Sequence, residues 1–349
     1  MRFFSLFLFA TILSTNAIAQ SDAISISGDL RYRHETRIEE GKEDRYLQRI
    51  RARLGFRANP TEQIEIRVGF ATVEDGNPVS ANITLSEGGS KKSFALDYAY
   101  FNYSISDQLQ LMGGKLRNPW YRAGGQPIIF DSDLTPEGLA LRYDMDNIFI
   151  NIVNFQSEEV KASDLDPQMI GGQIGVNLDN LVIGLGYQDY LDTQGSVPFY
   201  DGKNRRASLD ADGGYLYDYN IGEAFFQYTN DDLLDERLRV FGLMTQNFEA
   251  EEGANGFTLG LQYGNASGPG TWRVGYAYSD LERNTVLSLY TDSDIGGGGT
   301  GKKGHAIDFI YVLNSGLRYQ LTYFDNQILN SSDEYISYNR LHLDAQFSF

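Results

Sequence analysis

Apolar and polar residues alternate along most of the chain, in segments of about ten residues. In 64–70, Ile, Ile, Val and Phe alternate with Glu, Arg and Gly, and the pattern recurs in 139–144, 272–278 and 317–323. The last ten residues also alternate and end on Phe349. A period of two puts successive side chains on opposite faces of a β-strand. The pattern therefore predicts strands with one apolar face, each long enough to cross a bilayer when tilted.

Turn signals separate these segments and determine the number of strands. Seven are short, at Asn59-Pro60, Ser106-Asp107, Asp146-Asn147, Asp179-Asn180, Asp231-Asp232, Ser267-Gly268-Pro269 and Asn314-Ser315-Gly316. Eight longer polar stretches lie between them, at 38–45, 74–92, 117–135, 157–167, 191–217, 249–255, 282–304 and 327–335. With both termini on the short-turn side, these connections give sixteen antiparallel strands, within a range of about 14 to 18. The facing of segment 218–229 stays open, because its pattern fits either register.

In hydrocarbon only a closed barrel satisfies the hydrogen bonds of every strand edge. The expected fold class is therefore all-β, a transmembrane antiparallel β-barrel. Short periplasmic turns, long external loops and an aromatic end to the closing strand are typical of barrels in bacterial outer membranes. A soluble β-sandwich would alternate too, but an apolar face on nearly every strand favours the membrane barrel.

The N-terminal residues predict export. A basic residue follows Met1, an apolar run covers 3–12, and Ala17-Ile18-Ala19 provides a small-residue cleavage site. This is the pattern of a secretory signal peptide, and the apolar run is too short to span a bilayer. We expect a signal peptide at 1–19 and a single barrel domain at 20–349.

Composition excludes several classes of site. The chain of 349 residues has no cysteine, so disulfides, thiolate nucleophiles and cysteine metal ligands are ruled out. Its net charge of −18 disfavours nucleic acid as a partner. No pattern indicates a cofactor.

The polar face of the first strands carries a run of arginines. They are Arg31, Arg33, Arg37, Arg49, Arg51, Arg53, Arg57 and Arg67. A lipid-facing arginine costs about 2 to 4 kcal/mol near the midplane, so this face is expected to line the lumen. Sixteen strands leave room for water inside, whereas eight would be filled by side chains. As an alternative role, the arginines could form salt bridges with Asp29, Glu35, Glu65 and Asp97 that stiffen the wall.

The third long loop, 117–135, is too apolar to extend freely into water. It contains Trp120, Tyr121 and the run Ile128-Ile129-Phe130, so we expect it to fold inward and pack against the wall. Its carboxylates would then face the arginines, and such charged constrictions select solutes by field and by width. The expected pore-lining residues are Arg31, Arg33, Arg49, Arg51, Arg53, Arg67, Asp97, Arg117, Asp131, Asp133, Glu137 and Arg142.

Four segments resemble the putative porins of Gram-negative outer membranes. They are Arg-Ile-Arg-Ala-Arg-Leu-Gly-Phe at 49–56, Glu-Asp-Gly-Asn-Pro-Val-Ser-Ala-Asn at 74–82, Gly-Gly-Lys-Leu-Arg-Asn-Pro at 113–119 and Phe-Asp-Ser-Asp-Leu-Thr-Pro-Glu-Gly-Leu-Ala-Leu at 130–141. The clear match covers roughly the first 150 residues. The resemblance implies a passive diffusion channel for small hydrophilic solutes and ions, with no cofactor. It also implies outer-membrane lipid and lipopolysaccharide as surroundings, and homotrimers are common among such pores.

Two other functions were weighed. An outer-membrane hydrolase would need a serine, a histidine and an orienting polar group, but the chain has three histidines and no Gly-x-Ser-x-Gly motif. A surface receptor or adhesin would use loops 191–217 and 282–304. There we expect the exposed side chains of Tyr190, Phe199, Tyr200, Tyr215 and Tyr217, or the acidic glycine-rich run 292–299. That run could bind calcium through carboxylates, but a flexible external loop is the preferred interpretation.

Overall fold

The computed structural model describes residues 24–159, 166–202 and 206–349. The predicted signal peptide at 1–19 lies outside the described residues. Within them, no helix is long and apolar enough to cross a membrane.

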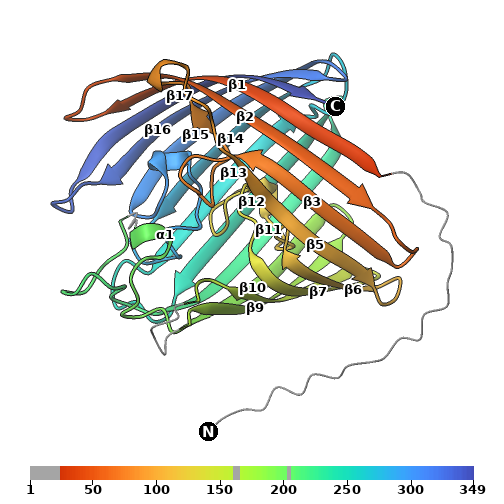
Figure 1. Cartoon of the computed structure of the whole chain (residues 1–349), viewed down its shortest axis with the longest axis horizontal. Coiled ribbons are helices and arrows are strands. Elements are labelled where there is room, and N and C mark those ends of the chain that lie inside the picture. The colour runs from red at the N-terminus through yellow and green to blue at the C-terminus, as the bar shows by residue number, and fades with distance from the viewer. Residues whose placement is uncertain (1–23, 160–165, 203–205) are drawn as a thin grey trace, which may run out of the picture.

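Sixteen long antiparallel strands form one closed barrel (Figure 1). The strands are β1 (Ser25–Glu39), β2 (Arg45–Ala58), β3 (Ile64–Thr72), β5 (Phe94–Ser104), β6 (Leu109–Lys115), β7 (Glu137–Met145), β8 (Ile148–Gln156), β9 (Gln168–Leu178), β10 (Leu181–Leu191), β11 (Tyr219–Leu233), β12 (Glu236–Asn247), β13 (Asn255–Gly264), β14 (Trp272–Leu281), β15 (Lys302–Asn314), β16 (Leu317–Leu329) and β17 (Tyr335–Ser348). The sheet also includes the two-residue β4 (Ile83–Thr84), which belongs to a loop and pairs with β2. Short helices are α1 (Phe199–Gly202), η1 (Glu87–Gly89), η2 (Ala123–Gly125) and η3 (Ile295–Gly297).

The last strand closes the barrel against the first. In this pairing Leu30 lies opposite Phe347, so the apolar face of the closing strand continues the apolar face of β1. The predicted fold class and strand number are confirmed. Two of the predicted turns contain Asp146 and Asp179 at φ of 48° and 49°, a left-handed conformation that aspartate tolerates better than most residues.

One predicted turn is displaced. The structure continues β11 through Asp231-Asp232 and turns at Leu234 and Asp235, both with positive φ. A register shift between Asn230 and Leu233 accommodates the extra residues. The sequence signal fell on the aspartates because leucine is an unusual residue at positive φ.

Packing inside the barrel fixes the facing of segment 218–229. Ile221, Glu223 and Phe225 are buried toward the lumen, whereas Phe226 and Tyr228 are exposed on the outer surface. Apolar Phe225 faces inward because the ring of Tyr121, from a loop inside the barrel, packs 5.2 Å from its own. The alternation was ambiguous because the lumenal face here is partly apolar.

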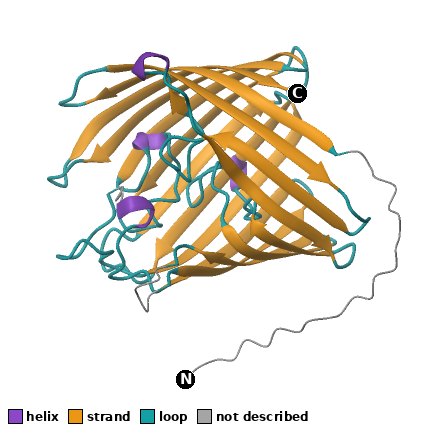
Figure 2. Cartoon of the chain, in the orientation of Figure 1, coloured by secondary structure: helices purple, strands orange, loops and turns teal. Residues whose placement is uncertain are grey.

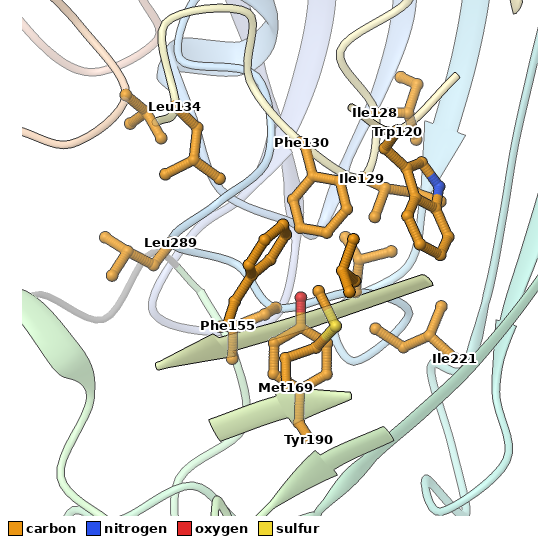
Figure 3. Close-up of a cluster of buried hydrophobic side chains, with 14 of the residues drawn as sticks. Trp120, Ile128, Ile129, Phe130, Leu134, Phe155, Met169, Tyr190, Ile221 and Leu289 are labelled. Atoms are coloured by element: carbon orange, nitrogen blue, oxygen red, sulfur yellow. The ribbon is translucent and has the colours of Figure 1, made fainter. Parts of the chain in front are cut away.

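Long connections fold into the lumen (Figure 2), and two of them contribute many buried residues. We call 116–136, between β6 and β7, the first inward loop, and 282–301, between β14 and β15, the second inward loop. Figure 3 shows Ile128, Phe130 and Leu289 from these loops packed together with wall residues such as Phe155 and Met169. The predicted inward folding of the third long loop is confirmed.

The expected exposure of aromatic side chains in loop 191–217, and of the glycine-rich run in loop 282–304, was wrong. Tyr190, Phe199 and Tyr215, expected to be exposed, are buried. Most of the second inward loop is buried as well, including Asp292, Ile295, Gly296, Gly298 and Gly299 of the glycine-rich run. This segment looked like a flexible external loop because its few apolar residues have no regular period, yet they complete the core of the lumen. In the part of the chain that the structure describes, no group of three acidic or histidine side chains could hold a metal ion.

Candidate pore and constriction

The first inward loop crosses the lumen and is fastened to the opposite wall. Trp120 Nε1 donates to Glu223 Oε1 on β11 at 2.7 Å. Gln173 on β9 holds the loop backbone at Tyr121, accepting from its N–H at 2.8 Å and donating to its carbonyl at 3.0 Å. These side chains supply the hydrogen bonds that an irregular buried backbone would otherwise lack.

A second pair of wall amides holds the loop at Gly124. Its N–H donates to Gln227 Oε1 at 2.9 Å, and its carbonyl accepts from Gln262 Nε2 at 3.0 Å. Gly124 has φ of +63°, and a Cβ built there would lie 2.3 Å from the ring of Phe241. The close approach of loop to wall therefore requires glycine at this position.

The second inward loop locks onto the first. Asp131 N–H donates to the Tyr290 carbonyl at 2.7 Å, and Asp292 N–H donates to the Pro127 carbonyl at 3.0 Å. The Asp131 carboxylate accepts from the Ser293 N–H at 2.8 Å. Burial raises the pKa of Asp131 well above 3.8, and the nearby Asp292 raises it further. Asp131 therefore joins the two loops, and its burial disfavours the charged form.

The second inward loop is in turn anchored to the barrel wall by Asp294. Its carboxylate lies 3.5 Å from Arg33 on β1 and 3.3 Å from Arg340 on β17. Burial would raise the pKa of Asp294, but Arg33, His342 and Arg340 together hold it well below 3.8. The anchor is therefore an ion pair.

An open polar cavity of about 730 Å³ remains beside the first inward loop. It runs along β2, β3 and β5, from Asp29 near the short-turn end of the barrel to the external residues around Pro78. Of the predicted pore-lining residues it brings together Arg53, Asp97, Arg117, Asp131, Asp133 and Glu137. The first inward loop and the arginine-bearing strand β2 thus line the same cavity.

Opposite charges pair in the lining of this cavity. Arg53 Nη1 lies 3.6 Å from Asp133 Oδ1 of the first inward loop, and its Nε donates to Asp29 at 2.7 Å. Asp133 also accepts from the backbone N–H of Ala81 at 3.2 Å. Arg117 stacks on Tyr98, with its guanidinium carbon 4.7 Å from the ring centroid.

Other predicted pore residues lie in the wall. Arg33, Arg49 and Arg51 are buried and paired with Asp344, Glu35 and Asp29 respectively. Their arrangement matches the salt-bridge role that the sequence analysis left open. Arg67 and Arg142 pair with the nearby carboxylates of Glu65 and Asp144 on the same strands, and Arg31 donates to Asn82, which is 51 residues away in sequence.

The sequence did not reveal two groups of residues. The first group comprises wall residues that hold the first inward loop, and the second comprises two basic side chains beside the cavity. The first group is Gln173, Glu223, Gln227 and Gln262, and the second is Lys115 and Arg122. Lys115 Nζ lies 3.1 Å from Glu137 Oε1, so the predicted pore residue Glu137 has a positive charge beside it. The alternating pattern places the glutamines on the lumen-facing side of their strands. It could not identify their partners in the loop, which are more than 50 residues away in sequence.

Comparison with known proteins agrees with this architecture. A family model described as "Putative porin" matches residues 8–211 and 225–347. No curated protein matches the chain. Among solved structures, a mutant of the porin of Rhodopseudomonas blastica shares 12% identity at a TM-score of 0.58, covering 94% of this chain and 100% of its own. OmpF of Salmonella typhi in complex with daunomycin shares 13% identity at a TM-score of 0.61, covering 93% and 97%. At these identities the structural likeness establishes the fold.

Proposed function

The chain belongs to the putative porin family, and from this premise we propose that the cavity beside the first inward loop is the narrowest part of its path for solutes. The protein is an integral β-barrel of the outer membrane and a porin, a water-filled channel for passive diffusion of small hydrophilic solutes and ions. The observation that supports the proposed path is the polar cavity bounded by Arg53 on one side and Asp133 on the other.

The pore residues act by position and charge, and we propose that no enzymatic step accompanies transport. Arg53, Arg117 and Asp97 would set the field in the passage, because ions and polar solutes respond to the charges that line a narrow pore. The buried arginines would keep the wall stiff. The predicted signal peptide at 1–19 would direct export of the chain.

Liposome swelling tests the proposed path. Proteoliposomes containing the barrel should swell in arabinose, glucose and raffinose at rates that fall with sugar size, because the inward loops leave a narrow opening. Empty liposomes provide the background. Failure of even the smallest sugar to enter would contradict the proposal, and equal rates for all three would contradict the placement of the narrowest part.

We also propose that the barrel works as a homotrimer within lipid and lipopolysaccharide. His34 on β1 and Gln48 on β2 project from the outer face, with Nδ1 and Nε2 2.7 Å apart. Polar groups facing hydrocarbon are unfavourable, so contact with another copy would cover them. Light scattering of the detergent-solubilised protein should give the mass of three chains, and a single-chain mass would contradict this proposal.

A further inference from the structure

Three lumenal arginines outside the predicted pore set lie on alternate strands of the barrel. They are Arg239 on β12, Arg273 on β14 and Arg318 on β16, and we call them the arginine crescent. All three are partly accessible to solvent.

The strand register places the crescent at one height in the lumen. Arg239 pairs with Gln262, which pairs with Gly275, and Arg273 is two residues nearer the short-turn end. The same step of two strands and two residues leads from Arg273 to Arg318. Barrel strands are tilted by about 35 to 45°, so paired residues on successive strands lie progressively nearer the external end of the barrel. Moving two residues back toward the short-turn end cancels this rise. Alternate strands lie about 10 Å apart, so the long side chains of two neighbouring members of the crescent can reach one small solute together.

The charges of the crescent interact with one another and with the predicted arginines. Arg273 is close enough to both Arg239 and Arg318 for their like charges to interact, and Arg318 interacts in the same way with Arg51 and Arg53. The crescent therefore continues the positive surface of β2 around the lumen.

Two of the three arginines are held by neutral groups. Arg239 Nη1 donates to Gln262 Oε1 at 2.8 Å, and Arg318 Nη2 donates to Gln346 Oε1 at 2.8 Å. An amide oxygen orients a guanidinium without neutralising it. Arg273 forms an ion pair with Asp308 at 2.6 Å. Asp231 and Asp29 are near enough to Arg239 and Arg318, respectively, for their charges to interact. The buried Nε donors of Arg239 and Arg273 have no hydrogen-bond partner among the described residues. The positive charge of the crescent is thus only partly compensated.

The crescent is also joined to the constriction. Gln262, which accepts from Arg239, donates to the Gly124 carbonyl of the first inward loop. The Arg239 guanidinium also lies near Tyr121 of that loop. A solute that passes the loop therefore meets the crescent on its way through the lumen.

We propose that the arginine crescent is a subsite for small oxyanions with two or more negative charges, such as inorganic phosphate or a dicarboxylate. The inference rests on the proposed function and names the solute class for which the channel is selective. Guanidinium groups bind the oxygens of phosphate and carboxylate in pairs. Clustered charge of one sign in a low-dielectric cleft raises the local concentration of the opposite ion. The chain's net charge of −18 would suggest the opposite preference, so the two predictions can be distinguished.

The test is the reversal potential of single channels in a KCl gradient. The wild type should prefer chloride over potassium, and Arg239→Gln/Arg318→Gln should lower that preference by about threefold or more. A matched control, Lys42→Gln/Lys92→Gln, removes two lysines that are paired with Glu39 and Glu87 outside the lumen, and it should leave the preference unchanged. A cation-selective wild type, or a double arginine variant with unchanged selectivity, would overturn the proposal.

A second readout identifies the class of anion. Phosphate or succinate added on the short-turn side should reduce the chloride current of the wild type more than acetate does, and this block should disappear in Arg239→Gln/Arg318→Gln. If the double variant fails to fold, Arg239→Lys/Arg318→Lys keeps the charge and should retain chloride preference while losing most of the phosphate block. Equal block by acetate and phosphate in the wild type would overturn the multivalent-anion subsite. Failure of the proposed function would look different, because no stepwise conductance would appear at all.

Discussion

At the scale of single residues, two arginines of β2 have different surroundings: Arg49 is buried in the wall, whereas Arg53 lines the cavity. The Arg49 side chain is 8% exposed and pairs with buried Glu35, whereas the Arg53 side chain is 36% exposed and reaches Asp133 across the cavity. Both occupy the same polar face of β2. Their roles differ because loop residues 78–84 cover Arg49, whose Nη2 donates to the Asn82 carbonyl at 3.1 Å.

This difference predicts two distinct mutant phenotypes. Arg53→Gln should shift the reversal potential toward cation preference with little change in stability, because it removes a charge from the passage. Arg49→Gln should lower the free energy of unfolding by about 3 kcal/mol, because a buried ion pair is broken, with little effect on selectivity. Reversal potentials and denaturant unfolding in micelles measure the two effects. An equal shift of reversal potential in both variants would contradict the assignment.

Asp131 gives the junction of the two inward loops a dependence on pH. Burial, together with Asp292 and Asp133, raises its pKa well above 3.8. The docked loop therefore keeps a proton that the undocked loop would release. Docking is strongest at low pH and weakens as the pH rises from about 3.8 toward the raised pKa.

We expect fluctuations of the open-channel current to increase over that pH range, because the junction loosens. Asp131→Asn should remove most of this increase, whereas Asp107→Asn, in an exposed short turn, should retain it. Single-channel noise recorded between pH 4 and pH 8, about the range in which buried carboxyls titrate, provides the measurement. An unchanged pH profile in Asp131→Asn would show that another group controls the junction.

At the scale of elements, strands were predictable and inward loops were only partly so. The alternation in 64–70 and 317–323 reports a local property, the two faces of one strand, so it can be read directly. The first inward loop was recognised because Trp120 and Phe130 are too apolar for solvent. The second inward loop was missed because Asp292, Ser293 and Asp294 appear solvated. Their partners, Pro127, Asp131 and Arg33, lie far away in sequence.

The sequence predicted which residues face the lumen, but not how they are arranged around the cavity. The two-residue alternation identified Arg49, Arg51 and Arg53 as lumenal, since the opposite, apolar face of the strand must contact lipid. The alternation cannot predict which arginine is shielded from solvent, because that depends on contacts with loop residues such as Asn82 and Asp133. The arginine crescent requires the register of strands β12 to β16, which no single segment of sequence contains.

The contact of the first inward loop with the wall predicts the effect of one glycine substitution. Gly124→Ala should increase single-channel conductance, because its Cβ would displace the loop from the ring of Phe241. Gly125→Ala is the matched control. It has a similar φ of +73° but nothing within 4 Å of the added Cβ, so it tests backbone strain alone. Equal conductance changes in the two variants would contradict the role of this contact.

At the scale of the whole molecule, the barrel provides a rigid frame and the inward loops determine its opening. Sixteen strands alone would enclose a wide lumen. The two inward loops fill much of it and leave a polar cavity along β2, β3 and β5, which we propose is the path for solutes. Strand pairing thus explains residence in the membrane, and loop packing explains the size and charge of the path.

Single-channel recording of the purified barrel in a planar bilayer tests the central claim most directly. The structure predicts discrete conductance steps of uniform size in KCl, since each folded barrel carries one narrow passage. Protein that is folded, as judged by a shift in electrophoretic mobility on heating, but that never produces stepwise conductance would contradict the account.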